Sequence, residues 1–479
     1  MVSALRKPGV EILAEIRRWD PRWADTDMVS GLIVKGHEAG GRIGEETTFI
    51  LVQKAVARSR LPVFARGGIG PHTAAAVLAA GGAGVVLDNQ LLLTRESPLS
   101  DAMRARLSRI TPDETGIIGD TSDTAWRIHE RPGFKHVRTL RSKIDSAEGV
   151  DVQARLSGLV GWTDPMREVL PLGQDVGFAP GLAERYRTAG AVLTALREAA
   201  REGVRLAATG PILTENSGVA AAHGTRWPVV QGPMTRVSDS AAFAESVARA
   251  GGLPMLALAL MRPGQVDTML AETRERLGDL PWGVGLLGFA AADLVKAQVE
   301  VALKYKPSYA LIAGGRPEQA RAMEEDGIPS YLHVPSPRLL AMFLEQGARR
   351  FVFEGRECGG HVGPLSSFVL WETMVTTLVD ELAKRSDARD ISVLFAGGIH
   401  DARSAAMVAA IAAPLAEVGV KVGVLMGSAY LFTKEIVESG AVVGGFQSEA
   451  LGCDGTVNLE TGPGHASRCG VTEVARFFQ

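Results

Sequence analysis

One histidine of this 479-residue chain lies in a sequence that suits chemistry beside a flat ring. The segment Glu357–Gly363 reads ECGGHVG, with Gly359 and Gly360 directly before His361. Glycines let the backbone pass close to a planar group. Histidine is the side chain whose unperturbed pKa, about 6.5, suits proton transfer near neutral pH. A surface-loop histidine would also explain the pattern, but the two glycines favour His361 as a catalytic residue.

Small residues follow two later apolar runs. They are Gly397, Gly398 and Ile399 after the first run, and Met426, Gly427 and Ser428 after the second. Backbone N–H groups at such turns can approach a phosphate, and a serine hydroxyl can donate to it. Glycine also ends many strands for purely structural reasons. Two such turns close together favour a phosphate-binding site over that explanation.

Two further runs end in residues that would leave room for a planar cofactor. The first ends in QGPM, which is Gln231, Gly232, Pro233 and Met234. The amide of Gln231 could hydrogen-bond a ring, although a simple structural turn explains the spacing equally well. The second run ends in Ala313, Gly314 and Gly315, of which Gly314 is the candidate contact for a cofactor or substrate.

The cysteines and the remaining histidines predict no metal site. The chain has three cysteines, too few for a disulfide framework or a zinc site. His223, His333 and His400 have no metal-ligand spacing to neighbouring acids or thiols. Cys358 could be a nucleophile, but its only apparent general base is His361, and a small apolar role beside a ring explains it better.

Eight apolar runs alternate with longer amphipathic stretches from Pro228 onward, as in repeated strand–helix units with buried strands. The predicted strands are Pro228–Met234, Leu253–Leu260, Pro281–Gly288, Tyr309–Pro317, Ser330–Ser336, Arg349–Gly360, Ile391–Ile399 and Val422–Leu431. Eight such units predict an α/β protein with a TIM (β/α)8 barrel, whose active site lies at the carboxyl ends of the strands. The two glycine-rich turns follow the seventh and eighth strands, where barrels commonly bind phosphate.

The N-terminal part of the chain repeats the end of this barrel. Residues 31–51, 62–69 and 84–96 match residues 350–370, 392–399 and 423–435 in the same order, and Val10–Ile16 is a candidate fourth strand. The repeat predicts a partial, degenerate second barrel of the same type. A four-stranded half-barrel cannot close. Either the missing half lies upstream in a longer protein, or another chain or the second barrel covers the strand edges.

Length and composition predict a globular protein of three parts. These are residues 1–110 as the partial repeat, 111–221 as a helical connecting region with a helix over Gly181–Gly203, and 222–479 as the barrel. A net charge of -3 gives no electrostatic reason to bind nucleic acid or an anionic membrane. No apolar run approaches the eighteen or so residues of a membrane span. With so few cysteines, we expect a cytoplasmic protein.

Taken together, the motifs resemble those of one enzyme family. QGPM, ECGGHVG, AGGI and GVLMGSAYL, in this order over about Pro228 to Gly440, are similar to the nitronate monooxygenase (2-nitropropane dioxygenase) family and its sister, the FMN-dependent enoyl-acyl carrier protein reductases. The resemblance implies a TIM barrel that binds FMN non-covalently, with His361 at the place of the family's active-site histidine. Cys358 stands where the family usually has alanine. The closing ETGPGHASRC and the tandem arrangement resemble enoyl reductase components of polyunsaturated fatty acid and polyketide synthases.

The resemblance implies an FMN oxidoreductase that takes electrons from NAD(P)H and reduces an enoyl thioester. The substrate would be a small molecule or an acyl-carrier-protein-bound chain, with other synthase domains or a second copy of the chain as further partners. Nitronate monooxygenase activity is the first alternative, because it would use the same site residues. A scaffold module without catalysis is the second. Retention of His361 and of both glycine-rich turns argues against a scaffold.

The repeat also predicts that its first copy holds no FMN. His361 aligns with Arg42, and Gly427 and Ser428 align with Asp88 and Asn89. A carboxylate at Asp88 would repel the phosphate dianion unless the carboxylate is protonated or paired with a cation. We therefore expect the first copy to be non-catalytic.

Overall fold

The computed structural model describes residues 7, 9–119, 125–131, 133–145, 156, 158–164, 167–462 and 465–477. The chain forms two compact units. Unit 1 comprises residues 1–208 with 364–373 and 406–411, and unit 2 comprises residues 209–363, 374–405 and 412–479. Among the described residues, no helix has both the length and the apolar character that crossing a membrane requires.

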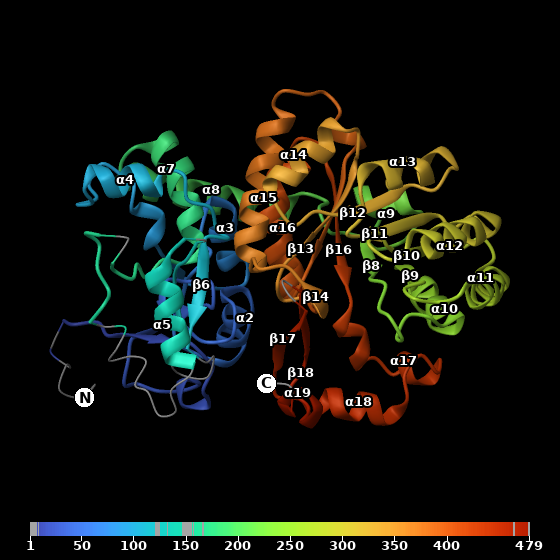
Figure 1. Ribbon diagram of the computed structural model, residues 1–479, viewed down its shortest axis with the longest axis horizontal. Helices are drawn as coiled ribbons and strands as arrows, with labels where there is room; N and C mark the ends of the chain where they lie inside the picture. Colours follow the sequence, from blue (N-terminus) through green and yellow to red (C-terminus); the bar gives the residue numbers. More distant parts are fainter. Residues whose placement is uncertain are drawn as a thin grey trace. The chain divides into compact units, whose positions relative to one another are not determined.

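Unit 2 contains a closed barrel of eight parallel strands (Figure 1). The strands are β8 (Val229–Gln231), β9 (Leu253–Ala257), β10 (Gly283–Leu287), β11 (Tyr309–Ala313), β12 (Ser330–His333), β13 (Arg350–Glu354), β15 (Ser392–Ala396) and β16 (Lys421–Met426). They follow one another in chain order, and β16 closes the barrel by pairing with β8. All eight predicted strands and the predicted TIM barrel are confirmed.

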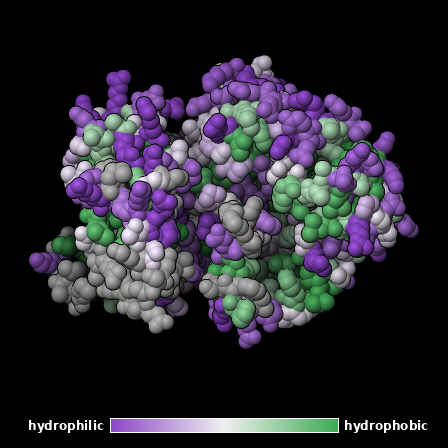
Figure 2. All heavy atoms as spheres, viewed as in Figure 1, coloured by the Kyte–Doolittle hydropathy of each residue, from purple (hydrophilic) through white to green (hydrophobic). Residues whose placement is uncertain are grey.

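Helices follow the barrel strands, except that the first, Gly218–His223, precedes β8 and contributes Val219 to the buried cluster of the barrel. They are α9 (Gly218–His223), α10 (Ala241–Arg249), α11 (Pro263–Leu277), α12 (Ala292–Tyr305), α13 (Pro317–Glu325), α14 (Pro337–Glu345), α15 (Ser367–Leu382) and α16 (Ala402–Glu417). In α14, Leu340, Phe343 and Leu344 share one buried face, while the Ser336 side chain caps the first turn. Figure 2 shows hydrophilic side chains over much of the visible surface, as this pattern requires.

The barrel interior is filled by side chains from alternate strand positions. Val230, Leu311, Tyr331, Val352 and Leu394 belong to one buried cluster. Side chains two residues further along a strand point to the same face, so the next interior layer lies at the carboxyl ends of the strands. This layer is where a barrel enzyme builds its site.

A short antiparallel sheet and several small helices complete unit 2. The sheet has the order β14-β18-β17, with β14 (Gly360–Val362), β18 (His465–Gly470) and β17 (Thr456–Gly462). The helices are α17 (Glu435–Glu438), α18 (Gly444–Leu451), α19 (Glu473–Phe477), η4 (Ala388–Asp390) and η5 (Ser428–Phe432). Part of the ETGPGHASRC motif, Pro463 and Gly464, lies outside the described residues.

Unit 1 contains an open parallel sheet of four strands in the order β1-β2-β4-β5. These are β1 (Leu13–Ile16), β2 (Gly31–Lys35), β4 (Val63–Arg66) and β5 (Gly84–Val86), with helices α2 (Thr48–Arg58) and α3 (Pro71–Ala79) between them. The order repeats that of β12, β13, β15 and β16 in the barrel. The predicted four repeat strands are therefore present, whereas the description of unit 1 as a degenerate barrel stays a prediction.

The segment between the two copies departs from the sequence prediction. A helical segment is expected here, but β6 (Thr115–Ile118) pairs with β7 (Trp126–His129), and β7 pairs with β3 (Gly41–Arg42), in one antiparallel sheet. The single helix predicted over Gly181–Gly203 is wrong, because two helices, α7 (Ala179–Tyr186) and α8 (Ala189–Thr209), replace it. The chain turns at Arg187, whose φ of 64° lies in the left-handed region. The other helices are α4 (Asp101–Leu107), α5 (Lys135–Asp145), η1 (Pro21–Trp23), η2 (Asn89–Leu91) and η3 (Gln174–Phe178).

Candidate active site

Backbone N–H groups without acceptors gather at the ends of β15 and β16. Gly398 follows β15 with a φ of 74°, a left-handed conformation that favours glycine. Gly427 precedes the short helix η5, which begins at Ser428. Within the described part of the chain, the N–H groups of Gly398, Gly427 and Ser428 donate to no acceptor. This arrangement fits a phosphate, whose oxygens accept several such bonds.

The structure brings several predicted site segments together at this turn. A Cβ added at Gly359 would lie 2.8 Å from Ser428 Oγ, so the ECGGH loop and the turn after β16 are in close contact. A Cβ added at Gly427 would lie 3.4 Å from Met234 Sδ. The N–H of Gly232 donates to Met426 O at 2.8 Å, which joins the QGPM segment to the same strand end.

Other predicted residues of this region lie in more closed surroundings. Ile399 is buried, and Pro233 packs against Gly285 of β10. Gln231 is also buried, and its Nε2 lies on the carbonyls of Gly232 and Met255, the latter at 3.4 Å. The amide nitrogen of Gln231 therefore donates to backbone carbonyls of the barrel and does not point into the barrel mouth. Gly397, with a φ of 112°, continues the left-handed turn after β15.

His361 lies on β14, outside the buried part of the barrel. It pairs with Ser467 of β18 and is exposed. Its ring meets the ring of Phe289 edge to face, with 6.3 Å between centroids. A Cβ added at Gly314 would lie 2.8 Å from Phe289, so the turn after β11 borders the same aromatic contact. Gly360, with a φ of 79°, sets the turn before the histidine.

Cys358 is buried and does not favour the thiolate form. Burial and the neighbouring Glu354 carboxylate raise the pKa of the Cys358 thiol well above its usual value. Its Sγ contacts the carbonyl oxygen of His361 at 3.5 Å. Because a thiol is nucleophilic only when ionised, these surroundings favour the small apolar role over a nucleophile.

A second histidine at the barrel mouth was missed from the sequence. His333 ends β12 and Glu354 ends the neighbouring β13, with 3.0 Å between His333 Nδ1 and Glu354 Oε2. Both follow interior residues, Tyr331 and Val352, by two positions, so both point into the barrel. The alternation of inward and outward residues along the strands was the signal in the sequence that could have indicated this pair, whereas His333 was considered only as a metal ligand. Across the described residues, no group of His, Cys, Asp and Glu could hold a metal ion.

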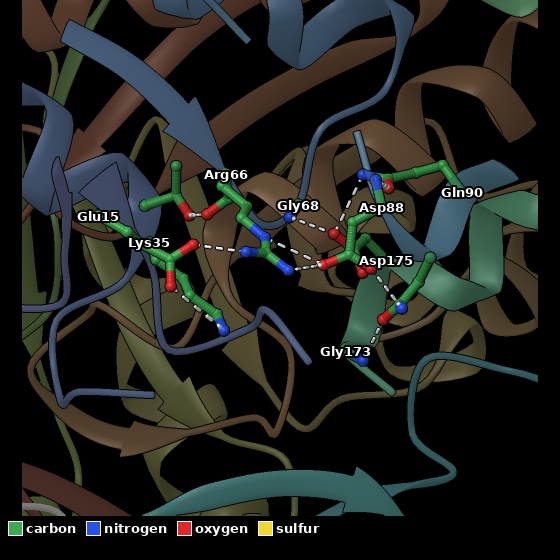
Figure 3. A network of polar contacts seen from close by, with 10 residues as sticks. Glu15, Lys35, Arg66, Gly68, Asp88, Gln90, Gly173 and Asp175 are labelled. Atoms are coloured by element: carbon green, nitrogen blue, oxygen red, sulfur yellow. Dashed lines mark hydrogen bonds and ion pairs between the residues drawn. The ribbon is translucent and has the colours of Figure 1, made fainter. Parts of the chain in front are cut away.

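The matching positions of unit 1 are filled by its own charged side chains (Figure 3). Arg66 Nη2 lies 2.6 Å from Asp88 Oδ2, and the same guanidinium binds Glu15. Lys35 Nζ lies 3.8 Å from Glu15. Asp88 is thus paired with a cation, so repulsion by its carboxylate alone does not exclude a phosphate from unit 1.

A carboxyl group of unit 1 binds the turn that matches the glycine turn after β15. Asp175 Oδ2 accepts hydrogen bonds from Gly68 N at 3.2 Å and from Gln90 Nε2 at 3.0 Å (Figure 3). Gly68 is the counterpart of Gly398, whose N–H has no acceptor. Burial, with Asp88 and Glu38 nearby, raises the pKa of Asp175 well above its usual value. The carboxyl group of Asp175 therefore already binds the N–H of Gly68 in unit 1.

Comparisons with known proteins identify the family of this chain. A family model described as nitronate monooxygenase matches residues 2–130 and 287–444, more than half of the chain. Two curated relatives share the name (3aS,4S,5R,7aS)-5-hydroxy-7a-methyl-1-oxo-octahydro-1H-indene-4-carboxyl-CoA dehydrogenase. The protein from Rhodococcus jostii (strain RHA1) is 29% identical over 218 residues, 44% of this chain and 54% of the relative. The protein from Mycobacterium tuberculosis (strain ATCC 25618 / H37Rv) is 30% identical over 241 residues, 49% of this chain and 60% of the relative.

The chain thus spans little more than half the length of these curated relatives. Among solved structures, FabK from Thermotoga maritima is 26% identical, with a TM-score of 0.46 over 55% of this chain and 76% of that chain. The family match extends over both copies of the repeat. The chain belongs to the nitronate monooxygenase family, whose members are FMN-dependent oxidoreductases.

Proposed function

We propose that the barrel of unit 2 binds FMN and reduces the double bond of an enoyl thioester, with NAD(P)H as the electron source. The observation that carries the proposal is the set of N–H groups at Gly398, Gly427 and Ser428 without acceptors. These groups would hold the phosphate, while the glycines at 314, 359 and 360 leave room for a ring. The flavin, when bound, supplies hydride transfer.

The thioester class is supported by the curated relatives. Both are named as dehydrogenases of a carboxyl-CoA compound, which is a thioester. A thioester carbonyl stabilises negative charge on its α-carbon. Reduction of an adjacent double bond therefore needs a hydride at the β-carbon and a proton at the α-carbon. An acyl chain on the carrier protein of a fatty acid or polyketide synthase presents the same thioester, and we propose this form as the substrate.

The chain's own residues would bind and orient this substrate. His361 is exposed beside Phe289, at the edge of the mouth, where it can donate a hydrogen bond to the thioester carbonyl or transfer a proton. The apolar ring of Phe289 is itself exposed and offers a surface for an acyl chain. Unit 1 takes no part in this chemistry, because its own side chains occupy the corresponding space.

The test begins with the absorption spectrum of the purified protein, which should show bound FMN. Anaerobic mixing with NADH and with NADPH should bleach the flavin, and a crotonyl-CoA or enoyl-acyl carrier protein substrate should restore its colour. Bleaching without reoxidation by either thioester would overturn the reductase proposal. Absence of bound flavin, even after reconstitution with FMN, would favour the scaffold alternative.

The name of the matching family model favours one second candidate, nitronate monooxygenase activity. The same site would then bind a nitronate, with His361 beside it, and oxygen would be the electron acceptor. Turnover of propyl 1-nitronate with oxygen uptake, and no flavin reduction by either nicotinamide, would establish this activity in place of the reductase.

A further inference from the structure

In the His333–Glu354 pair at the barrel mouth, the charge of the carboxylate decides which group donates the hydrogen bond and which accepts it. Burial acts to raise the pKa of Glu354, but the charge of His333 and the hydrogen bonds from His333 and Cys358 outweigh it, and the pKa is lowered. At neutral pH the carboxylate is therefore ionised and can only accept. His333 must therefore donate from Nδ1. In the neutral ring Nε2 then carries the lone pair, and in the imidazolium Nε2 carries a proton that can be transferred.

The other ring nitrogen of His333 has nothing to bind. Its Nε2 is buried and has no hydrogen-bond partner among the residues that the structure describes. Buried polar atoms of folded proteins are nearly always paired. A histidine that is held at Nδ1 and open at Nε2, inside the mouth of a barrel, has the geometry of a group whose partner is the substrate.

Unit 1 carries a different set of side chains at the same positions. By alignment and strand register, the counterparts are Glu15 for His333, Lys35 for Glu354, Arg66 for Ala396 and Asp88 for Gly427. In unit 1 these four charged side chains bind one another. In the barrel, Ala396 and Gly427 stand at the positions of Arg66 and Asp88. Neither can bind His333, so Glu354 is its only partner among these positions.

We infer that His333 is a proton-transfer residue of the barrel and that Glu354 positions it. The inference rests on the proposed function, in which a thioester is reduced. The Nε2–H bond of the imidazolium breaks and a C–H bond forms at the α-carbon, while the β-carbon receives a hydride that derives from the reduced nicotinamide dinucleotide. The carbon–carbon double bond becomes single. His333 is left neutral with its proton on Nδ1, and solvent returns the proton to Nε2.

A first experiment measures the histidine directly, without catalysis. Long-range ¹H–¹⁵N spectra of the ¹⁵N-histidine-labelled holoenzyme are recorded over a pH series, and the His333 signals are assigned from their loss in His333→Gln. The neutral ring should carry its proton on Nδ1. In Glu354→Gln, the share of the neutral ring with its proton on Nδ1 should fall relative to the Nε2–H tautomer, because the anionic acceptor is gone. Cys358 and His361, the other titratable groups near the pair, are unchanged.

A second experiment measures the proton-transfer step. In His333→Gln, reoxidation of the reduced enzyme by crotonyl-CoA should slow about 10²–10⁴-fold, and free imidazole should restore part of the rate. FMN affinity and flavin reduction by NAD(P)H should stay close to the wild type. His223→Gln is the matched control, because His223 ends α9, where it binds Tyr331 Oη at 2.8 Å and packs on Tyr309 at the start of β11, away from the carboxyl ends of the strands. It should reoxidise at the wild-type rate.

The outcomes separate the inference from the proposed function. A wild-type enzyme that reduces crotonyl-CoA while His333→Gln reduces it equally fast would overturn the role of His333 alone. An Nε2–H tautomer in the wild type, or a tautomer ratio unaffected by Glu354→Gln, would overturn the positioning role of Glu354. A wild-type enzyme without thioester reduction would refute the function and the step together. Circular dichroism and melting of each variant confirm that the barrel is folded.

Discussion

The substitution Gly427→Asp tests the phosphate site most directly, because unit 1 carries aspartate at the matching position. A Cβ at Gly427 would have only Met234 Sδ at 3.4 Å and Met234 Cγ at 3.8 Å near it, so the side chain fits. In unit 1, Asp88 lies 2.6 Å from Arg66. In the barrel, Ala396 replaces that arginine, and the new carboxylate would have no cation from this position.

The expected loss of affinity follows from charge. Two unit charges about 5 Å apart repel by about 3 kcal/mol at an effective dielectric near 20, and a phosphate dianion doubles this figure. If solvent and ions screen half of it, about 3 kcal/mol remains. Since about 1.4 kcal/mol corresponds to a factor of ten, the dissociation constant of FMN should rise by about two orders of magnitude.

The assay is titration of FMN into the flavin-free protein, followed by quenching of flavin fluorescence. Gly427→Asn is the matched control, because it has the same shape without the charge and should lose much less affinity. Circular dichroism should show an intact fold for both variants. Equal FMN affinity for the aspartate variant and the wild type would place the phosphate elsewhere and refute the cofactor assignment. Unfolding of both variants would refute the steric reasoning.

Three further predictions follow from the two copies. Each chain should bind one FMN, as the ratio of flavin absorbance to protein concentration measures; two tightly bound flavins would contradict the filled site of unit 1. His361→Ala should keep its flavin while turnover falls by about 10²–10³-fold, because His361 is placed to donate a hydrogen bond to the thioester carbonyl, and normal turnover would assign it a structural role. The raised pKa of Asp175 in the folded state should make the wild type lose stability as pH rises from the unfolded pKa, near 4, through the folded one. Asp175→Asn should therefore have a higher melting temperature than the wild type at pH 8. If the difference in melting temperature between the variant and the wild type were the same at pH 5 and at pH 8, Asp175 would be ionised in the folded protein.

The strands and the turns of the barrel could be predicted because their signals are local. Apolar runs that end in glycine or polar residues indicated all eight barrel strands, and the glycine pairs indicated the sharp turns after β15 and elsewhere. Arg187 gave no such signal, since a non-glycine residue in the left-handed region can be read only from the structure. The long helix was therefore predicted unbroken.

The partners of charged side chains could not be predicted, because they depend on register across strands. Asp88 aligns with Gly427, which suggested repulsion, but its cation, Arg66, comes from the neighbouring strand 22 residues earlier. His333 and Glu354 meet for the same reason, as ends of adjacent strands. Asp175 lies 107 residues from Gly68, to which it binds, so no local pattern could have indicated it.

The glycine turns of the two copies share one backbone shape although different groups face them. Gly67 and Gly68 have φ values of 108° and 67°, close to the 112° and 74° of Gly397 and Gly398, although the carboxyl group of Asp175 binds Gly68 in unit 1. A glycine pair after the seventh strand is therefore no marker of a bound nucleotide in tandem chains of this kind. The two copies differ instead at the position before that pair and at the position after the last strand, where unit 1 has Arg66 and Asp88, which bind each other, and the barrel has Ala396 and Gly427.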